Sequence, residues 1–196
     1  CVPEKNNQYG GNLQTFSRDK LIFDTGVHYL GGLSKGQNLH QFFSYLEIMD
    51  DLQLQKMDEN GFDKITFEDN DIEYPHAQGY GNFVKQLSEY FPEEKENLEN
   101  YCEEIQRVCN YFPRYNVIGQ NNYSEEILHL NTKRFIESIT SNEKLQAALL
   151  GSNFLYAGDS ESIPFYVHAL TVNSYIQSAY KCVKGGSQIS KLLIKK

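Results

Sequence analysis

The sequence predicts an α+β fold in which a small antiparallel β-sheet, a meander, packs with several α-helices. Apolar and polar residues alternate within residues 52–75, and from residue 80 onward apolar residues recur every three or four positions. The chain has 196 residues, 40% of them hydrophobic, so it can bury a sizeable core. Its 14 Tyr and 12 Phe, with no Trp, predict an aromatic-rich core, with a wide apolar pocket as the alternative.

The N-terminal part is extended and rich in glycine. We expect a strand end at residues 1–5 and short strands at 21–23 and 27–30, around the turn at Asp24-Thr25-Gly26. Apolar residues at helical spacing then predict a helix at 36–46.

The meander follows this helix. Asn60-Gly61 is typical of a two-residue hairpin turn, because both residue types tolerate a positive φ. We expect it to join strands at 52–55 and 62–68, and a second turn at 69–71 to lead into a third strand at 72–74.

The rest of the chain is mainly helical. Pro92 suits the first position of a helix, and the two acidic residues after it face the positive end of the helix dipole. Thr140 and Glu143 predict a capping box for a helix that runs to residue 150. Further helices are predicted at 80–91, at 165–180 and after Gly185-Gly186. The helix after Pro92 has the clearest apolar face: Leu98, Tyr101, Cys102, Ile105, Val108, Cys109 and Phe112.

Charge and cysteines exclude several classes of function. A net charge of −8 argues against nucleic-acid binding, which requires a basic surface. The four cysteines form no Cys-x-x-Cys pair, so neither zinc nor thioredoxin-type chemistry is expected. Phe62 stands where a calcium loop needs an oxygen ligand, so we expect no metal site. Without a secretory or membrane-spanning apolar run, we expect a cytoplasmic protein, and peripheral membrane contact stays open.

A set of residues near the N-terminus matches the needs of a dinucleotide. An acidic residue at a strand end, such as Glu4, can accept hydrogen bonds from ribose hydroxyls. Gly10-Gly11 permits a pyrophosphate to approach the backbone closely, and Thr15 adds a hydroxyl. Gly26 allows a second close approach, beside a flavin ring.

These residues belong to a wider pattern. It comprises Glu4-Lys5, Gly10-Gly11 with Thr15, the run Phe-Asp-Thr-Gly-Val-His-Tyr at 23–29, the segment 164–170, and Tyr180 with Gly185-Gly186. In their order and separation these pieces resemble the phytoene desaturase-like flavoproteins, and within them the retinol saturase and carotenoid isomerase branch. The resemblance extends through the whole chain.

The resemblance implies a Rossmann-like FAD-binding domain with a substrate domain inserted between its strands. Residues 1–32 would be a remnant of the FAD-binding domain, residues 33–178 the substrate-binding domain, and residues 179–196 the return toward the FAD-binding domain. Two family segments, the N-terminal Gly-x-Gly-x-x-Gly and the C-terminal FAD segment, are not in this sequence. We therefore expect FAD in the full-length parent and not in this chain alone.

The resemblance also implies roles for individual residues. Glu4 would bind the adenosine ribose, and Gly10, Gly11 and Thr15 the phosphates. The residues near the flavin or the substrate mouth would be Gly26, His28, Gly185 and Gly186. His28 is the catalytic candidate as a polar group beside the flavin, and a structural turn histidine is the equal alternative.

Two functions follow as hypotheses. In the first, the parent is an FAD-dependent oxidoreductase acting on C=C bonds of an apolar polyene or isoprenoid, and this chain is mainly its substrate-binding domain, inactive by itself. In the second, the chain is an inactive binding or oligomerisation module without flavin. It would then bind lipids, or pair with another copy through surfaces exposed by truncation.

Overall fold

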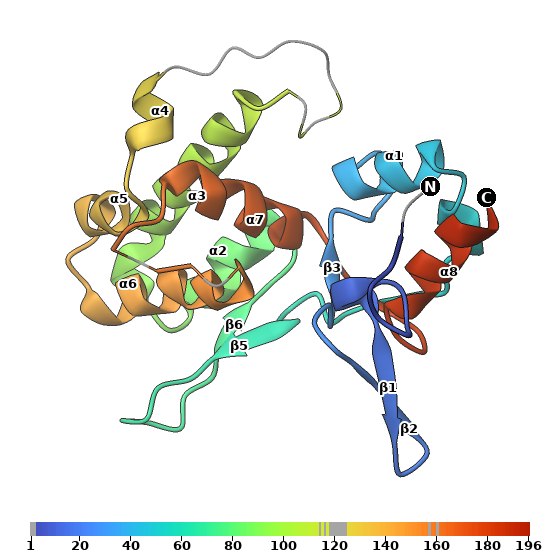
Figure 1. Ribbon diagram of the computed structural model, residues 1–196. Helices are drawn as coiled ribbons and strands as arrows, with labels where there is room; N and C mark the ends of the chain where they lie inside the picture. The colour runs from blue at the N-terminus through green and yellow to red at the C-terminus, as the bar shows by residue number, and fades with distance from the viewer. Residues whose placement is uncertain (1–2, 114, 116, 118–124, 157, 160) are drawn as a thin grey trace. The chain divides into compact units, whose positions relative to one another are not determined.

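The computed structural model of the protein describes residues 3–113, 115, 117, 125–156, 158–159 and 161–196. The chain forms two compact units (Figure 1). Unit 1 comprises residues 1–57 and 179–196, and unit 2 comprises residues 58–178. Residues 33–57, predicted to belong to the substrate-binding domain, therefore lie in unit 1 with residues 1–32 and 179–196. The function assigned to each of these segments stays a prediction.

Unit 1 is built on a three-stranded antiparallel sheet. Strand β7 (Ala179–Cys182) lies in its centre, between β3 (Leu30–Gly31) and β4 (Leu54–Lys56). Two helices complete the unit, α1 (Asn38–Tyr45) and α8 (Ser187–Lys195), with short 3₁₀ turns η1 (Gly11–Leu13) and η2 (Met49–Asp51). Its core consists of Leu33, Phe43, Ile48, Leu52, Cys182 and Ile189.

A two-stranded hairpin, β1 (Thr15–Arg18) and β2 (Leu21–Asp24), extends from unit 1 (Figure 1). Asp19 and Lys20 form its two-residue turn with φ of 52° and 65°, and two positive φ values match the twist of a tight hairpin. Strand β2 confirms the prediction at 21–23, whereas the sequence analysis missed β1. The hairpin holds Thr15 opposite Asp24.

Unit 2 is mainly helical. Its hairpin is β5 (Asp63–Ile65) with β6 (Tyr74–His76). The helices that follow are α2 (Tyr80–Ser88), η3 (Pro92–Glu94), α3 (Lys95–Asn110), α4 (Glu125–His129), α5 (Thr132–Ile139), α6 (Glu143–Leu150), η4 (Gly151–Tyr156) and α7 (Phe165–Gln177). Helix α3 packs against α2, α5 and α7.

The α+β fold class is confirmed, and so is the apolar face of α3. Six of its seven predicted residues are buried, from Leu98 to Cys109, and Phe112 packs partly buried against them. Pro92 opens a 3₁₀ turn that leads directly into α3, as the proline rule predicts. No helix within the described residues is both long and apolar enough to cross a membrane.

The predicted meander is wrong in its pairing. Strand β4 pairs with β7, not with β5, and Met57 N donates to Ala179 O at 3.0 Å. Asn60-Gly61 makes no hairpin, because Asp58 Oδ1 accepts a hydrogen bond from Asn60 N (2.9 Å) and so forms a local side-chain turn. Local spacing could not reveal that β4 would pair with a strand more than 120 residues later in the sequence.

Four other predicted elements are corrected. The cap of α6 is Asn142, whose Oδ1 accepts from two backbone N–H groups of the first turn, so the predicted Thr140–Glu143 box is misplaced. Helix α7 ends at Gln177, because Ser178 is extended and the next residues pair as β7. Of the strand end predicted at 1–5, residues 3–5 form no strand, and residues 1–2 lie outside the described residues. Of the strand predicted at 27–30, only Leu30 lies in a strand.

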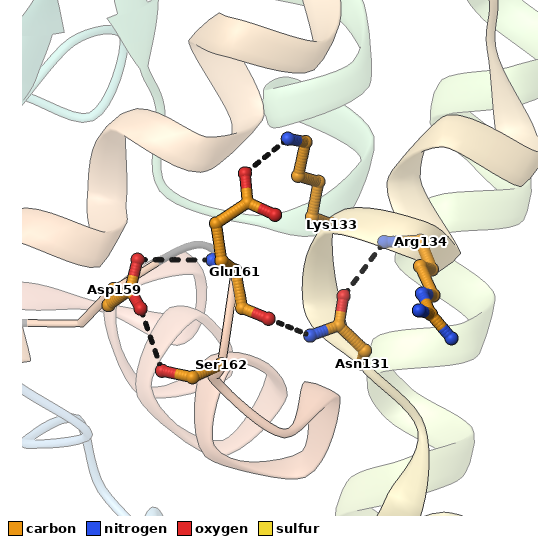
Figure 2. A network of polar contacts seen from close by, with 6 residues as sticks. All are labelled: Asn131, Lys133, Arg134, Asp159, Glu161 and Ser162. Atoms are coloured by element: carbon orange, nitrogen blue, oxygen red, sulfur yellow. Dashed lines mark hydrogen bonds and ion pairs between the residues drawn. The ribbon is translucent and has the colours of Figure 1, made fainter.

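A polar network fastens the loop before α7 to the start of α5 (Figure 2). Asn131 caps α5 by accepting from Arg134 N (3.0 Å), and its Nδ2 donates to Glu161 O (2.9 Å). Lys133 forms an ion pair with Glu161 across the same loop. Asp159 Oδ1 accepts from Glu161 N at 3.2 Å, which fixes the turn. All these partners lie within unit 2 and have a structural role.

Candidate functional site

Residues from the two ends of the chain meet inside unit 1. Asp24 Oδ1 accepts a hydrogen bond from Gly186 N at 2.7 Å, directly before α8. Thr15 Oγ1, across the hairpin from Asp24, donates to Ser187 Oγ at 3.2 Å. We call Thr15, Asp24, Gly185 and Gly186 the glycine junction.

Close packing explains why glycine stands at 185. Gly185 has a φ of +90°, and a Cβ there would lie 2.5 Å from Thr15 Cγ2 and 2.8 Å from Asp24 Oδ1. The carboxylate of Asp24 also lies at the N-terminal end of α8, where the helix dipole favours a negative charge. The chain therefore supplies its own anion at the helix end that an external phosphate would otherwise use.

The two glycines at the start of η1 differ in their surroundings: Gly10 packs against α8, whereas Gly11 is open. Gly10 has a φ of +109°, and a Cβ there would lie 2.6 Å from Ser190 Oγ of α8. The Ser190 Oγ is buried and has no hydrogen-bond partner among the described residues. A Cβ on Gly11 would meet no atom within 4 Å, so this backbone is open to a ligand.

The loop between β2 and β3 carries the other predicted residues. Gly26 is exposed and lies against Asn12, and the loop is held by a bond from Val27 N to Asn12 O (3.2 Å). His28, in the same loop, is exposed. Glu4 is exposed too, and its Oε1 accepts from Asn6 N at 2.8 Å.

The predicted cofactor residues thus fall into two groups. Glu4, Gly11 and Gly26, with the catalytic candidate His28, are exposed. Thr15, Gly185 and Gly186 are engaged in the glycine junction, and Gly10 packs against α8. Four of the eight predicted site residues are therefore exposed, and the other four are in contact with other parts of the chain.

Three residues of this region were missed by sequence reasoning. Asp24 was noted in its motif but not as the partner of the last helix, and Ser187 and Ser190 were not singled out. Two serines three positions apart on a helix share one face, and that spacing after Gly-Gly was the available signal.

The chemistry available in unit 1 is limited. Burial, and then the charge of Asp24, raises the pKa of the Cys182 thiol to about 11, so this thiol is protonated and unreactive. Within the described residues, no three His, Cys, Asp or Glu side chains are grouped so as to hold a metal ion.

No family model matches the chain. Among curated proteins, the all-trans-retinol 13,14-reductase of Rattus norvegicus is 27% identical over 212 residues, covering 96% of this chain and 34% of the relative. That of Danio rerio is 24% identical, covering 98% of this chain and 35% of the relative. Prolycopene isomerase 2, chloroplastic, of an Oncidium hybrid cultivar is 30% identical over 101 residues, covering 52% of this chain and 17% of the relative.

The chain thus spans about a third of the length of the retinol reductases that it matches. The match runs through nearly the whole chain, as the resemblance implied. It includes both ends of the sequence that meet in the glycine junction. The chain is therefore similar over nearly its whole length to all-trans-retinol 13,14-reductases, and over about half of it to a prolycopene isomerase, which agrees with the resemblance of its motifs to the phytoene desaturase-like flavoproteins.

Proposed function

We propose that this chain is mainly the substrate-binding part of an FAD-dependent oxidoreductase that acts on C=C bonds of an apolar polyene or isoprenoid. The observation that carries the proposal is the alignment of 96% of the chain with reductases of a polyene alcohol. Flavin, when bound, would supply the hydride exchange. The protein would then have to bind and orient the apolar substrate.

The open residues of unit 1 are the ones that would hold the cofactor. Glu4 offers an exposed carboxylate to a ribose, and Gly11 offers backbone with no atom near its Cβ position. Gly26 and His28 lie on one exposed loop, where they would face the ring or the mouth of the substrate site. The glycine junction would hold these loops in place and exclude water from the base of α8.

The proposal is tested on the full-length parent, by measuring flavin absorbance after purification. Gly11→Asp should abolish or strongly reduce bound flavin, because it places a negative charge where phosphates would approach. Gly36→Asp is the matched control, since Gly36 also has a positive φ and no atom within 4 Å of its Cβ position. A parent that purifies without flavin, or Gly11→Asp protein with full flavin content, contradicts the proposal.

A second candidate is a binding or oligomerisation module without flavin. The exposed hairpin favours it: Phe16 and Phe23 stack at 5.3 Å between ring centroids, yet they are 52% and 42% exposed. Exposed apolar patches mark interaction surfaces. This candidate predicts that the purified chain is colourless and that light scattering shows self-association. The double variant Phe16→Ser/Phe23→Ser should then be monomeric. This result would support the module over flavin binding by the chain alone.

A further inference from the structure

We propose that the tip of the β1–β2 hairpin inserts into the interface of a membrane that contains anionic lipids. The hairpin extends from unit 1 (Figure 1), and all of its residues from 16 to 23 are exposed. Four of them are large and apolar, and each is more than 40% exposed: Phe16, Leu21, Ile22 and Phe23. The inference goes beyond the proposed function, because it involves neither the flavin nor the substrate.

The apolar side chains lie on both faces of the hairpin. Phe16 is opposite Phe23 in the register and stacks on it. Leu21 shares this face with Phe23, because side chains alternate along a strand. Ile22 therefore points to the other face, and it is 52% exposed. A second copy of the chain would cover one face, whereas a lipid interface surrounds a tip that enters it, so the two-sided exposure favours lipid.

The base of the hairpin is fixed to the rest of unit 1, which leaves the turn as its free end. Thr15 Oγ1 donates to Ser187 Oγ at 3.2 Å, and Asp24 Oδ1 accepts from Gly186 N at 2.7 Å. These contacts hold both strands where the hairpin begins. A protruding element with a fixed base can enter an interface without disturbing the core of its unit.

The backbone limits how deep the tip can enter. The sheet has two strands, and no third strand among the described residues pairs with it. The outer edges of β1 and β2 therefore carry N–H and C=O groups that need water or lipid head groups, which excludes them from the hydrocarbon centre. An interfacial position, roughly 5–10 Å into the boundary between head groups and acyl chains, suits both the edges and the apolar side chains.

The charge of the tip selects the head group. Arg18 and Lys20 flank Asp19 at the turn, so the tip has a net positive charge. The bias extends to the whole unit: of the chain's 18 basic and 26 acidic residues, ten basic and six acidic ones lie in unit 1. Long basic side chains place their charges among lipid phosphates while apolar neighbours enter the interface. Anionic lipid therefore fits this hairpin although the chain as a whole is acidic.

Tryptophan fluorescence tests the insertion, because the chain has no Trp of its own. In the whole chain, Leu21→Trp places a single indole at the tip. Vesicles of phosphatidylcholine with phosphatidylserine should shift its emission to the blue, and brominated acyl chains should quench it, because the indole enters the interface. Ile194→Trp is the matched control, since Ile194 of α8 is 61% exposed and Leu21 is 62% exposed. Its emission should stay unchanged.

Vesicle sedimentation measures the strength of binding. Leu21→Ser with Ile22→Ser should weaken binding about tenfold or more, because two large apolar side chains no longer enter the interface. Arg18→Gln with Lys20→Gln should weaken binding to the anionic vesicles about ten- to thirtyfold and reduce its dependence on salt. The same charge variant should leave binding to pure phosphatidylcholine unchanged. All four side chains are exposed, so circular dichroism should show that both variants stay folded.

Two lysines of α8 provide the control for charge. Lys191→Gln with Lys195→Gln removes two exposed positive charges from the same unit and should weaken binding about threefold at most. The proposal is overturned if vesicles leave the Leu21→Trp emission in place, if Leu21→Ser with Ile22→Ser binds like the unaltered chain, or if the α8 variant loses as much binding as the tip variant. A blue shift that follows protein concentration without vesicles would show that a second copy covers the hairpin, and would overturn it too.

Discussion

The core of unit 2 and the glycine junction of unit 1 bury polar groups in different ways. In unit 2 the completely buried His168 lies between Tyr101 (2.7 Å to Nε2) and Tyr156 (3.0 Å to Nδ1), within a cluster of aromatic rings. In unit 1, partly buried polar contacts depend on short side chains and glycines from opposite ends of the chain. Large packed side chains therefore stabilise unit 2, whereas close contacts between glycines and short side chains stabilise unit 1.

The same contrast extends to the surface. Unit 1 exposes Phe16, Leu21, Ile22 and Phe23 on its hairpin, each more than 40% accessible, whereas most of the described aromatic residues of unit 2 are buried or partly buried. Unit 2 thus has the features of an independently packed core. The predictions below test whether the two units respond to different kinds of change.

The largest effect should come from removing volume in unit 2. Phe165 is completely buried, with its ring centroid 4.1 Å from that of Phe135. Phe165→Ala should lower the free energy of unfolding by about 3–5 kcal/mol, because it leaves a cavity in a packed core. Phe154→Ala is the control, since Phe154 is 93% exposed and should change stability by less than about 0.5 kcal/mol. Urea unfolding measures both, and equal effects would contradict a core centred on Phe165.

The next effect is a loss of unit 2 stability in acid. Burial lowers the pKa of His76 to about 4, and burial with the charge of His76 lowers that of His168 to about 3, from an ordinary 6.5. The unfolded state therefore binds more protons as the pH falls below 6.5, and stability is lost from there down to the folded pKa values. Between about pH 7 and about pH 5, each histidine should remove about 2 kcal/mol.

Urea unfolding at the two pH values measures this loss, and histidine variants assign it. His168→Gln should reduce the pH dependence, because it removes one of the two buried imidazoles. A pH dependence that survives removal of both buried histidines would assign the acid sensitivity to carboxylates instead.

The contrast also explains which parts of the fold the sequence could predict. Local periodicity was sufficient for α3, whose Leu98-to-Cys109 face repeats at three and four positions and is buried as predicted. It failed for β4, because the partner strand β7 is far away in sequence and its residues 179–180 continue the apolar pattern of α7. Pairing between distant segments leaves no local signal, so strand partners in unit 1 could not be derived.

The candidate site follows the same rule. Glycine motifs predicted close approach by a cofactor, but the sequence could not say which glycines other parts of the chain approach. At Gly185 the neighbours are Thr15 and Asp24 of the chain itself, whereas Gly11 is open. Whether a glycine contacts the chain or stays open depends on which distant segments meet. That can be known only once the pairing of the strands is known.

A comparable effect, confined to unit 1, should follow from filling the glycine junction. Gly185→Ala should destabilise unit 1 by about 2–4 kcal/mol, because the new methyl group meets Thr15 and Asp24 in addition to the cost of a positive φ. Gly36→Ala isolates that packing contribution, since Gly36 has a similar φ of +84° but open space, and should cost only about 1 kcal/mol. Hydrogen exchange of the β7 amides measures the difference. Equal losses of stability in the two variants would show that glycine is required at position 185 because of the positive φ, and not because of the close contacts with Thr15 and Asp24.

The smallest effect tests the charge at the junction. Asp24→Asn keeps the shape of the side chain and removes the negative charge beside Gly186 N and the first turn of α8. We expect a loss of about 0.5–1 kcal/mol at low salt, which shrinks as salt screens the helix dipole. Glu47→Gln is the control, because Glu47 makes only an exposed 3.4 Å ion pair with Lys196 and should cost less. A loss at Asp24 that does not change with salt would mean that Asp24 acts through its hydrogen bond alone, and that the dipole of α8 is not what places an anion there.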